Sequence, residues 1–417
     1  MNTNKEIHYY LKYLLVFLMI SFSGFPYFTN APNALLISLI MIFFLFSKII
    51  LKRIDNKKIY QLFFVLIIIF IGQSIQFSFF DVRSLGTLLI RFLLALIIAL
   101  LVGNELPKIY VNLLKVISII SLVFFLTIYI FPSFENILLF HIAPIFNQES
   151  SSSFYKYTPN IIVFTLNIYD SSIGLLRNPG PFWEAGGFAC FLIPAIIFNS
   201  LLNEKILNRT NLLFLLTLFT TFSTAAYLSI FVYAIFVIIP IVNRKSIILL
   251  PIIFSLFFFA GSYAYRVPFV SERIDRTIIY LAYPKESMYL KRDRAISAIV
   301  DFNDIKNYPI FGRGRGENRY DKNNDFTDFE HRNNGVTDFF VKFGLIFGII
   351  YFRGIYKSLQ NLALLFKRKP NFIIASFLAI IIMGLTQIIF MQTFFITLSV
   401  LYIFINVNND LNRSNLT

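Results

Sequence analysis

Residues 266–334 hold a dense group of side chains that could do chemistry on a polar substrate. The segment contains 13 Lys/Arg and 11 Asp/Glu and lies between two apolar runs. Charges are costly inside a bilayer and are rarely kept there without a use. We therefore expect this segment to form part of the working surface of the protein.

Within this segment, the sequence YPIFGRGRGENRY places Arg313 and Arg315 among glycines. Guanidinium groups bind phosphate oxygens through paired hydrogen bonds, and glycines let backbone N–H groups approach the same anion. The pattern favours a diphosphate ligand. The alternative is a solvated turn whose arginines attract anionic lipid headgroups. A nucleotide loop is disfavoured, because no Gly-Lys-Ser/Thr follows.

A second candidate is RNPGPFWEAGG, in which Arg177 and Glu184 flank a Pro/Gly-rich stretch before an apolar run. The arginine could bind a phosphate, and the carboxylate could take a proton from a hydroxyl. The alternative is an interfacial salt bridge in which Trp183 acts as a membrane anchor.

Three further candidates are His331, Asp338 and Arg91. Histidine side chains titrate near neutrality, so His331 could act as a general base or a hydrogen-bond donor. Asp338 lies about one turn into an apolar helix, where Lys342, four residues later, could be its partner. Arg91 lies within an apolar run and either snorkels to the interface or reaches into the bundle.

No metal site or cofactor is predicted. The sequence contains no HExxH motif and no paired Cys/His set, and its single cysteine, Cys190, lies in an apolar run. Asp301 and Asp304 are expected on a solvated face.

The elements that position these residues are membrane helices. The chain is 57% hydrophobic and contains 52 Phe among 417 residues, which is more apolar surface than a soluble core could bury. Apolar runs of about 17–22 residues match the length that crosses a bilayer as helix. The sequence predicts an all-α transmembrane bundle of about twelve spans, forming one integral membrane domain over residues 1–417. The predicted spans are 10–27, 33–50, 60–78, 85–103, 112–131, 183–201, 210–222, 224–242, 246–264, 335–353, 371–388 and 391–406.

The net charge of +15 is explained by topology rather than by nucleic-acid binding. Basic residues recur in short loops at alternate turns, which is typical of cytoplasmic loops. These residues are Lys48, Lys52, Arg53, Lys57, Lys58, Lys205, Arg209, Arg244, Lys245, Arg353, Lys357, Lys367, Arg368 and Lys369. Both termini are therefore predicted to be cytoplasmic, and two long segments, 132–182 and 265–334, are predicted to be outer loops.

The second outer segment is expected to rest on the helices as a lid. Its stretch MYLKRDRAISAIVDFNDI has the spacing of an amphipathic helix lying on the membrane surface. Its apolar face would carry Leu290, Ala295, Ile296, Ile299 and Val300. About 70 residues of this charge density offer too little apolar area to fold alone.

Taken together, these motifs resemble the O-antigen polymerase and O-antigen ligase superfamily of bacterial envelope proteins. The resemblance covers roughly residues 175–353 and rests on Arg177 with G-P-F-x-E, on LLTLFTTFSTAAYLSI, and on Pro309-Ile-Phe-Gly-Arg-Gly followed by His331-x-Asn and a G-x-x-x-G helix. Two positions differ from the family pattern: Thr224 stands where Arg is usual, and Ala185 where Pro is usual.

The resemblance implies a metal-independent, C-type glycosyltransferase in the bacterial inner membrane. Its implied substrate is an undecaprenyl-diphosphate-linked glycan, and its implied partners are membrane lipids and a chain-length regulator protein. The base would be Glu184 or His331. Diphosphate or loop positioning would fall to Arg177, Arg294, Arg313 and Arg315, with Arg91 and Asp338 as further substrate-binding candidates.

Two other functions compete with polymerisation of repeat units. An O-antigen ligase would transfer the glycan to lipid A core. A lipid-linked oligosaccharide flippase would be expected to show internal repeats and charges within its helices, whereas here the charges gather in the outer loops.

The topology predicts that Cys introduced at Ser151 and at Asn323, in a Cys190→Ala background, reacts with a membrane-impermeant thiol reagent added to intact spheroplasts. Both positions fall in predicted outer loops. Cys at Lys205, in a predicted cytoplasmic loop, should react only after permeabilisation. Protection of either outer position in intact spheroplasts would overturn the topology.

Overall fold

The computed structural model describes residues 3–29, 35–43, 57–78, 82–146, 159–166, 169–170, 175–203, 206, 208–238, 275, 278–279, 282–283, 294–314 and 333–405. The fold is all-α. Within these residues the regular elements are helices, apart from one antiparallel pair of two-residue strands, β1 (Tyr169–Asp170) and β2 (Leu175–Leu176). The candidates Arg315 and His331 and the predicted span 246–264 lie outside the described residues.

Each predicted span that falls within the described residues coincides with a helix. The N-terminal half comprises α1 (Thr3–Gly24), α2 (Pro26–Thr29), a helix over 35–43, α4 (Lys57–Phe77), α5 (Val82–Val102), η1 (Gly103–Glu105), α6 (Leu106–Ile130), α7 (Ser133–Ile137), η2 (Leu138–Ile142) and α8 (Ala143–Phe146). The C-terminal half comprises α9 (Ala185–Leu202), α10 (Arg209–Thr220), α11 (Thr224–Ile238), α14 (Arg294–Asn307), α15 (Gly335–Leu365), α16 (Pro370–Gly384), α17 (Thr393–Val400) and η7 (Leu401–Ile403).

Four segments of the described chain are long and apolar enough to cross a membrane: Lys57–Phe77, Leu85–Ile130, Ala185–Leu202 and Gly335–Leu365. The second contains both α5 and α6, separated by η1. The count of twelve spans is not confirmed. In particular, α10 has 12 residues and α17 has 8, and at about 1.5 Å per residue neither crosses roughly 30 Å of hydrocarbon as helix.

The centre of the bundle is formed where α6, α9 and α17 meet. Residues 185–201 of α9 are all buried, as expected of a helix that is apolar all round. The Tyr110 ring of α6 stacks on Phe394 of α17 with centroids 4.6 Å apart. The Tyr110 hydroxyl donates to the Phe191 carbonyl of α9 at 3.0 Å, so the buried phenol has the partner that it needs.

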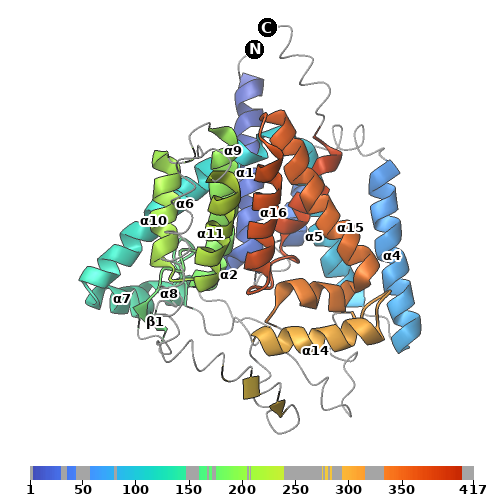
Figure 1. Ribbon diagram of the computed structural model, residues 1–417. Coiled ribbons are helices and arrows are strands. Elements are labelled where there is room, and N and C mark those ends of the chain that lie inside the picture. The colour runs from blue at the N-terminus through green and yellow to red at the C-terminus, as the bar shows by residue number, and fades with distance from the viewer. Residues whose placement is uncertain are drawn as a thin grey trace, which may run out of the picture.

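The two ends of the bundle differ. The helices α7, α8 and α14 lie at the end drawn lowest in Figure 1, hereafter the lower end, and α1 begins at the opposite end. The first predicted outer segment, 132–182, packs against the bundle: Phe164 stacks on Phe124 of α6 with centroids 5.4 Å apart. Partial burial on α7 raises the pKa of Glu135 above its ordinary value.

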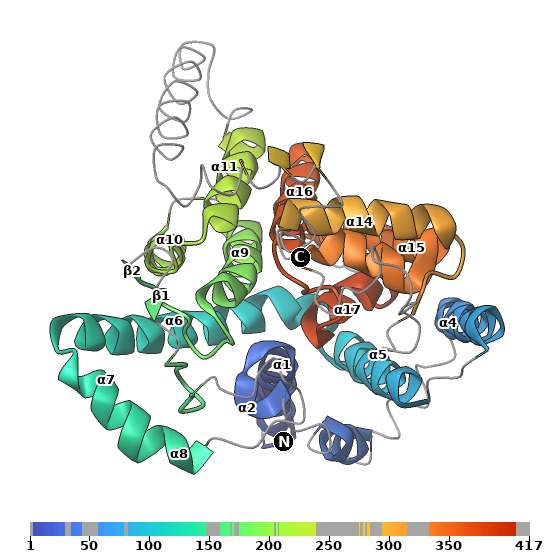
Figure 2. The ribbon, with the colours of Figure 1, turned by 90° about the horizontal axis from the view of Figure 1, so that it is seen from below.

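The helix α15 is broken at Gly344, whose φ of 76° is left-handed. Its first half lies across the lower end beside α14, and its second half rises into the bundle (Figures 1 and 2). The segment after α14 supplies hydrogen bonds at the break. Arg313 N donates to Val341 O at 2.7 Å, Gly314 N donates to Lys342 O at 3.1 Å, and Leu345 N donates to Pro309 O at 2.7 Å.

This arrangement requires glycine on both sides of the contact. A Cβ at Gly344 would lie 2.0 Å from Ile310 O, and one at Gly312, with φ 71°, would lie 2.5 Å from Val341 O. Gln73 of α4 completes the junction, because its Nε2 donates to Phe311 O at 2.6 Å and to Lys342 O at 2.8 Å. Gly312 and Gly314 of the GRGRG motif therefore serve helix packing in this structure.

We expect Gly344→Ala and Gly312→Ala each to destabilise the protein by more than about 2 kcal/mol, because each combines a left-handed backbone with a contact that no Cβ can make. Thermal unfolding in detergent measures the effect. Gly86→Ala on α5 is the control, since its Cβ would meet nothing within 4 Å. An unchanged melting temperature for Gly344→Ala would contradict this account of the kink.

Candidate functional site

The acidic face of α14 is buried, which corrects the expectation that Asp301 and Asp304 are solvated. Their exposed fractions are 0% and 2%. Ile296, Val300 and both aspartates recur at helical spacing on the face that packs on α15, while Ile299, expected on the apolar face, is 38% exposed. The amphipathic pattern correctly predicted a helix, but its two aspartates face protein, where each carboxylate has a partner.

The partner of Asp304 is Arg313. The Asp304 Oδ1 to Arg313 Nη1 distance is 2.9 Å and both side chains are 2% exposed. The guanidinium also lies over the Tyr308 ring, 5.4 Å from its centroid. Buried charges need such pairing. A role for Arg313 in binding a diphosphate stays a prediction, and it would require this pair to open.

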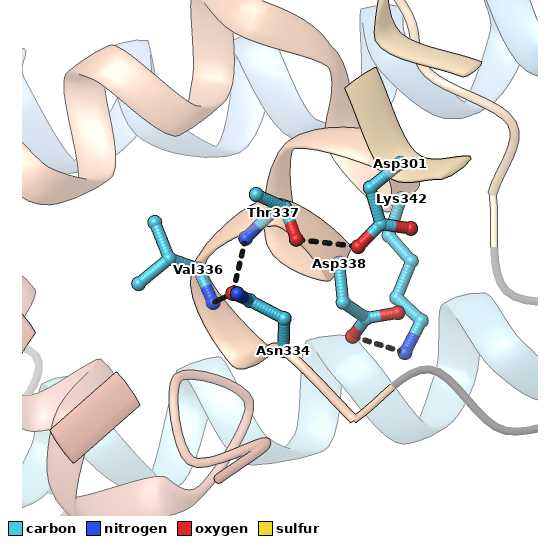
Figure 3. Close-up of polar contacts among 6 residues, drawn as sticks. All are labelled: Asp301, Asn334, Val336, Thr337, Asp338 and Lys342. Carbon is cyan, nitrogen blue, oxygen red and sulfur yellow. Dashed lines mark hydrogen bonds and ion pairs between the residues drawn. The ribbon is translucent and has the colours of Figure 1, made fainter. Parts of the chain in front are cut away.

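The partner of Asp301 is the Thr337 hydroxyl, which donates to Asp301 Oδ2 (Figure 3). Thr337 belongs to the first turn of α15. That turn is capped by Asn334, whose Oδ1 accepts from Val336 N and Thr337 N at 3.2 Å each. A side-chain oxygen at this position satisfies N–H groups that have no partner within the helix.

Asp338 pairs with Lys342, the partner expected from their spacing. Lys342 Nζ lies 2.6 Å from Asp338 Oδ2, and the Asp338 side chain is 1% exposed (Figure 3). The pair therefore contributes to the structure of α15. Its role in binding a substrate stays a prediction.

Glu184 immediately precedes α9 and is half-buried. Its backbone is extended, with φ −161° and ψ 167°, and its carboxylate does not cap α9. Instead, Gln387 Nε2, from the loop 385–392 between α16 and α17, donates to Glu184 Oε1. A carboxylate beside the N-terminus of a buried helix could accept a proton from a bound hydroxyl.

Arg177 is half-buried, and its Nε donates to Thr221 O at 2.9 Å. The next residue, Asn178, donates from its amide to Thr220 Oγ1 at 2.9 Å. These bonds attach the stretch before α9 to the turn between α10 and α11. Trp183 is only 8% exposed, so it packs inside the protein and is not an exposed interfacial anchor.

The two remaining candidate arginines within the described residues, Arg91 and Arg294, lie on different helices. Arg91 of α5 is half-buried, and its Nη1 donates to Met391 O at 3.1 Å, so it reaches into the bundle rather than snorkelling. Arg294 is the first residue of α14 and is half-buried. Thus the structure joins Glu184 and Arg91 to one loop, residues 385–392, and Arg313 and Asp338 to one helix pair, α14 and α15.

Two glutamines were missed by the sequence analysis, namely Gln73 and Gln387. Both lie in largely apolar stretches, and both are at least nine-tenths buried. A buried amide is costly without hydrogen bonds, so a glutamine in an apolar run was the available signal. In the part of the chain that the structure describes, no group of three or more His, Cys, Asp or Glu could hold a metal ion.

We expect Asp304→Ala and Arg313→Ala each to lower the free energy of unfolding by about 3–5 kcal/mol, because each leaves a buried charge without its partner. The double variant should lose much less free energy of unfolding than the sum of the two single losses. Unfolding in detergent measures the cycle, with Lys306→Ala, on the exposed face of α14, as the control. Additive effects would show that the two charges do not stabilise each other.

Comparison with known proteins leaves the family of this chain unassigned. No protein-family model matches the sequence. No curated protein is significantly similar to it.

Proposed function

We propose that this protein is a metal-independent, C-type glycosyltransferase that polymerises undecaprenyl-diphosphate-linked repeat units into O-antigen or capsular polysaccharide. In this proposal it is a multi-pass protein of the bacterial inner membrane, with both termini cytoplasmic and the lower end facing outward. The observation that carries the proposal is the Glu184 carboxylate, half-buried beside the N-terminus of the apolar helix α9.

The chemistry needs few groups. The hydroxyl of one lipid-linked glycan attacks the anomeric carbon of another, the bond from that carbon to the diphosphate oxygen breaks, and undecaprenyl diphosphate leaves. Glu184 would take the hydroxyl proton, with His331 as the alternative base. Positive charge must stabilise the departing diphosphate, and Arg177 and Arg294 are the half-buried arginines proposed for this.

The distribution of charge supports an enzyme over a flippase. Among the described residues, the buried Asp and Arg side chains lie on α14, on α15 and in the segment that joins them, whereas a transporter would carry charges along its pathway through the membrane. Gene deletion separates the candidates. A product with a single repeat unit indicates a polymerase, unattached long polymer indicates a ligase, and cytoplasmic accumulation indicates a flippase.

We expect Glu184→Gln to lower the polymerisation rate by about 10²- to 10⁴-fold, the usual contribution of a general base, without changing the melting temperature.

We expect Arg177→Lys to lower the polymerisation rate by about 10²- to 10³-fold, nearly as much as Arg177→Ala, because lysine lacks the planar pair of donors that arginine presents. Purified protein extending lipid-linked repeat units in a chelator gives the measurement.

The control is Glu135→Gln, a half-buried glutamate on α7 at the lower end (Figure 1), which should keep the wild-type rate. Full activity of Glu184→Gln would transfer the base role to His331. Activity that requires added manganese or magnesium would reject the metal-independent mechanism.

A further inference from the structure

Gln387 joins two parts of the chain that are far apart in sequence. It lies in the loop 385–392, it is 9% exposed, and its Nε2 donates to Oε1 of Glu184, 203 residues away. An amide N–H can only donate, so this group selects an acceptor such as a carboxylate. The bond holds one oxygen of Glu184. Its other oxygen, Oε2, accepts no hydrogen bond within the described residues.

The loop that carries Gln387 is itself held at several points. The Tyr351 hydroxyl of α15 donates to Phe390 O at 2.6 Å, and Arg91 of α5 donates to Met391 O at 3.1 Å. Within the loop, Ile389 N donates to Gln387 O at 2.9 Å. A glutamine on a mobile loop would not restrain a carboxylate, whereas this loop is anchored to two long helices.

Two glycines leave the space that the Gln387 side chain and backbone occupy. A Cβ at Gly186 would lie 2.8 Å from Gln387 Nε2 and 3.1 Å from Glu184 Oε1. A Cβ at Gly335, the first residue of α15, would lie 2.1 Å from Gln387 O. The starts of α9 and of α15 are thus both shaped around one residue of the loop.

We propose that Gln387 is a positioning residue, which holds the Glu184 carboxylate in one orientation and leaves Oε2 to take the proton of the acceptor hydroxyl. The inference rests on the proposed function, because it presumes that Glu184 is the base. Without the bond, an extended glutamate at the start of a helix would sample several rotamers, and a misplaced catalytic group lowers the rate more than it lowers binding.

The test compares Gln387→Leu with the exchange variant Glu184→Gln/Gln387→Glu, in purified protein with lipid-linked repeat units. Gln387→Leu should lower kcat by about 10- to 100-fold with KM unchanged. The exchange variant keeps an amide–carboxylate pair but moves the carboxylate from position 184 to position 387. It should therefore melt at the wild-type temperature and be as inactive as Glu184→Gln. Thr386→Val, which alters the neighbouring residue, should keep the wild-type rate.

Gln387→Asn provides a second variant if Gln387→Leu does not fold, because it keeps the loop polar but shortens the amide by one methylene. A wild-type kcat for either folded variant overturns the positioning role while leaving Glu184 as the base. Activity restored by the exchange variant also overturns it, because a structural pair would then suffice. Full activity of Glu184→Gln alone rejects the base assignment itself.

Discussion

The requirement that buried backbone groups find hydrogen-bond partners determines how the lower end of this protein is built. A helix broken inside an apolar environment exposes N–H and C=O groups that no water can satisfy. The break in α15 at Gly344 is tolerated because residues 309–314 donate and accept at the break and Gln73 adds two further bonds. Residues 309–314 follow directly from α14, so the same bonds hold that helix on α15.

Charge pairing follows from this packing. Once α14 is held against α15, Asp301 and Asp304 have no access to water, and each needs a partner. Thr337 and Arg313 supply them. Arg313, which the sequence favoured for binding an external anion, is therefore paired within the protein. The half-buried side chains of Glu184, Arg177 and Arg294 are the better candidates for chemistry.

The loop 385–392 has a comparable organising role around α9. Its carbonyls accept from Tyr351 and Arg91, and its single buried glutamine reaches Glu184. The short helix α17 that follows is buried at the centre of the bundle. A candidate base fixed by a loop tied to two long helices is more rigid than one placed on a free surface loop, which suits a reaction that depends on orientation.

The positions of the helices within the predicted spans followed from the sequence, since a run of apolar residues long enough for a bilayer has few structures open to it besides helix. The amphipathic helix at 294–307 and the pairing of Asp338 with Lys342 followed from local spacing in the same way. The sequence did not show which polar residues are buried, because an amphipathic pattern does not say whether its polar face meets water or another polar face. Three features were decided only by the tertiary structure: the burial of Asp304 with Arg313, the use of the backbone of residues 309–314 at the α15 break, and the contact of Gln387 with Glu184. Each depends on segments brought together by packing.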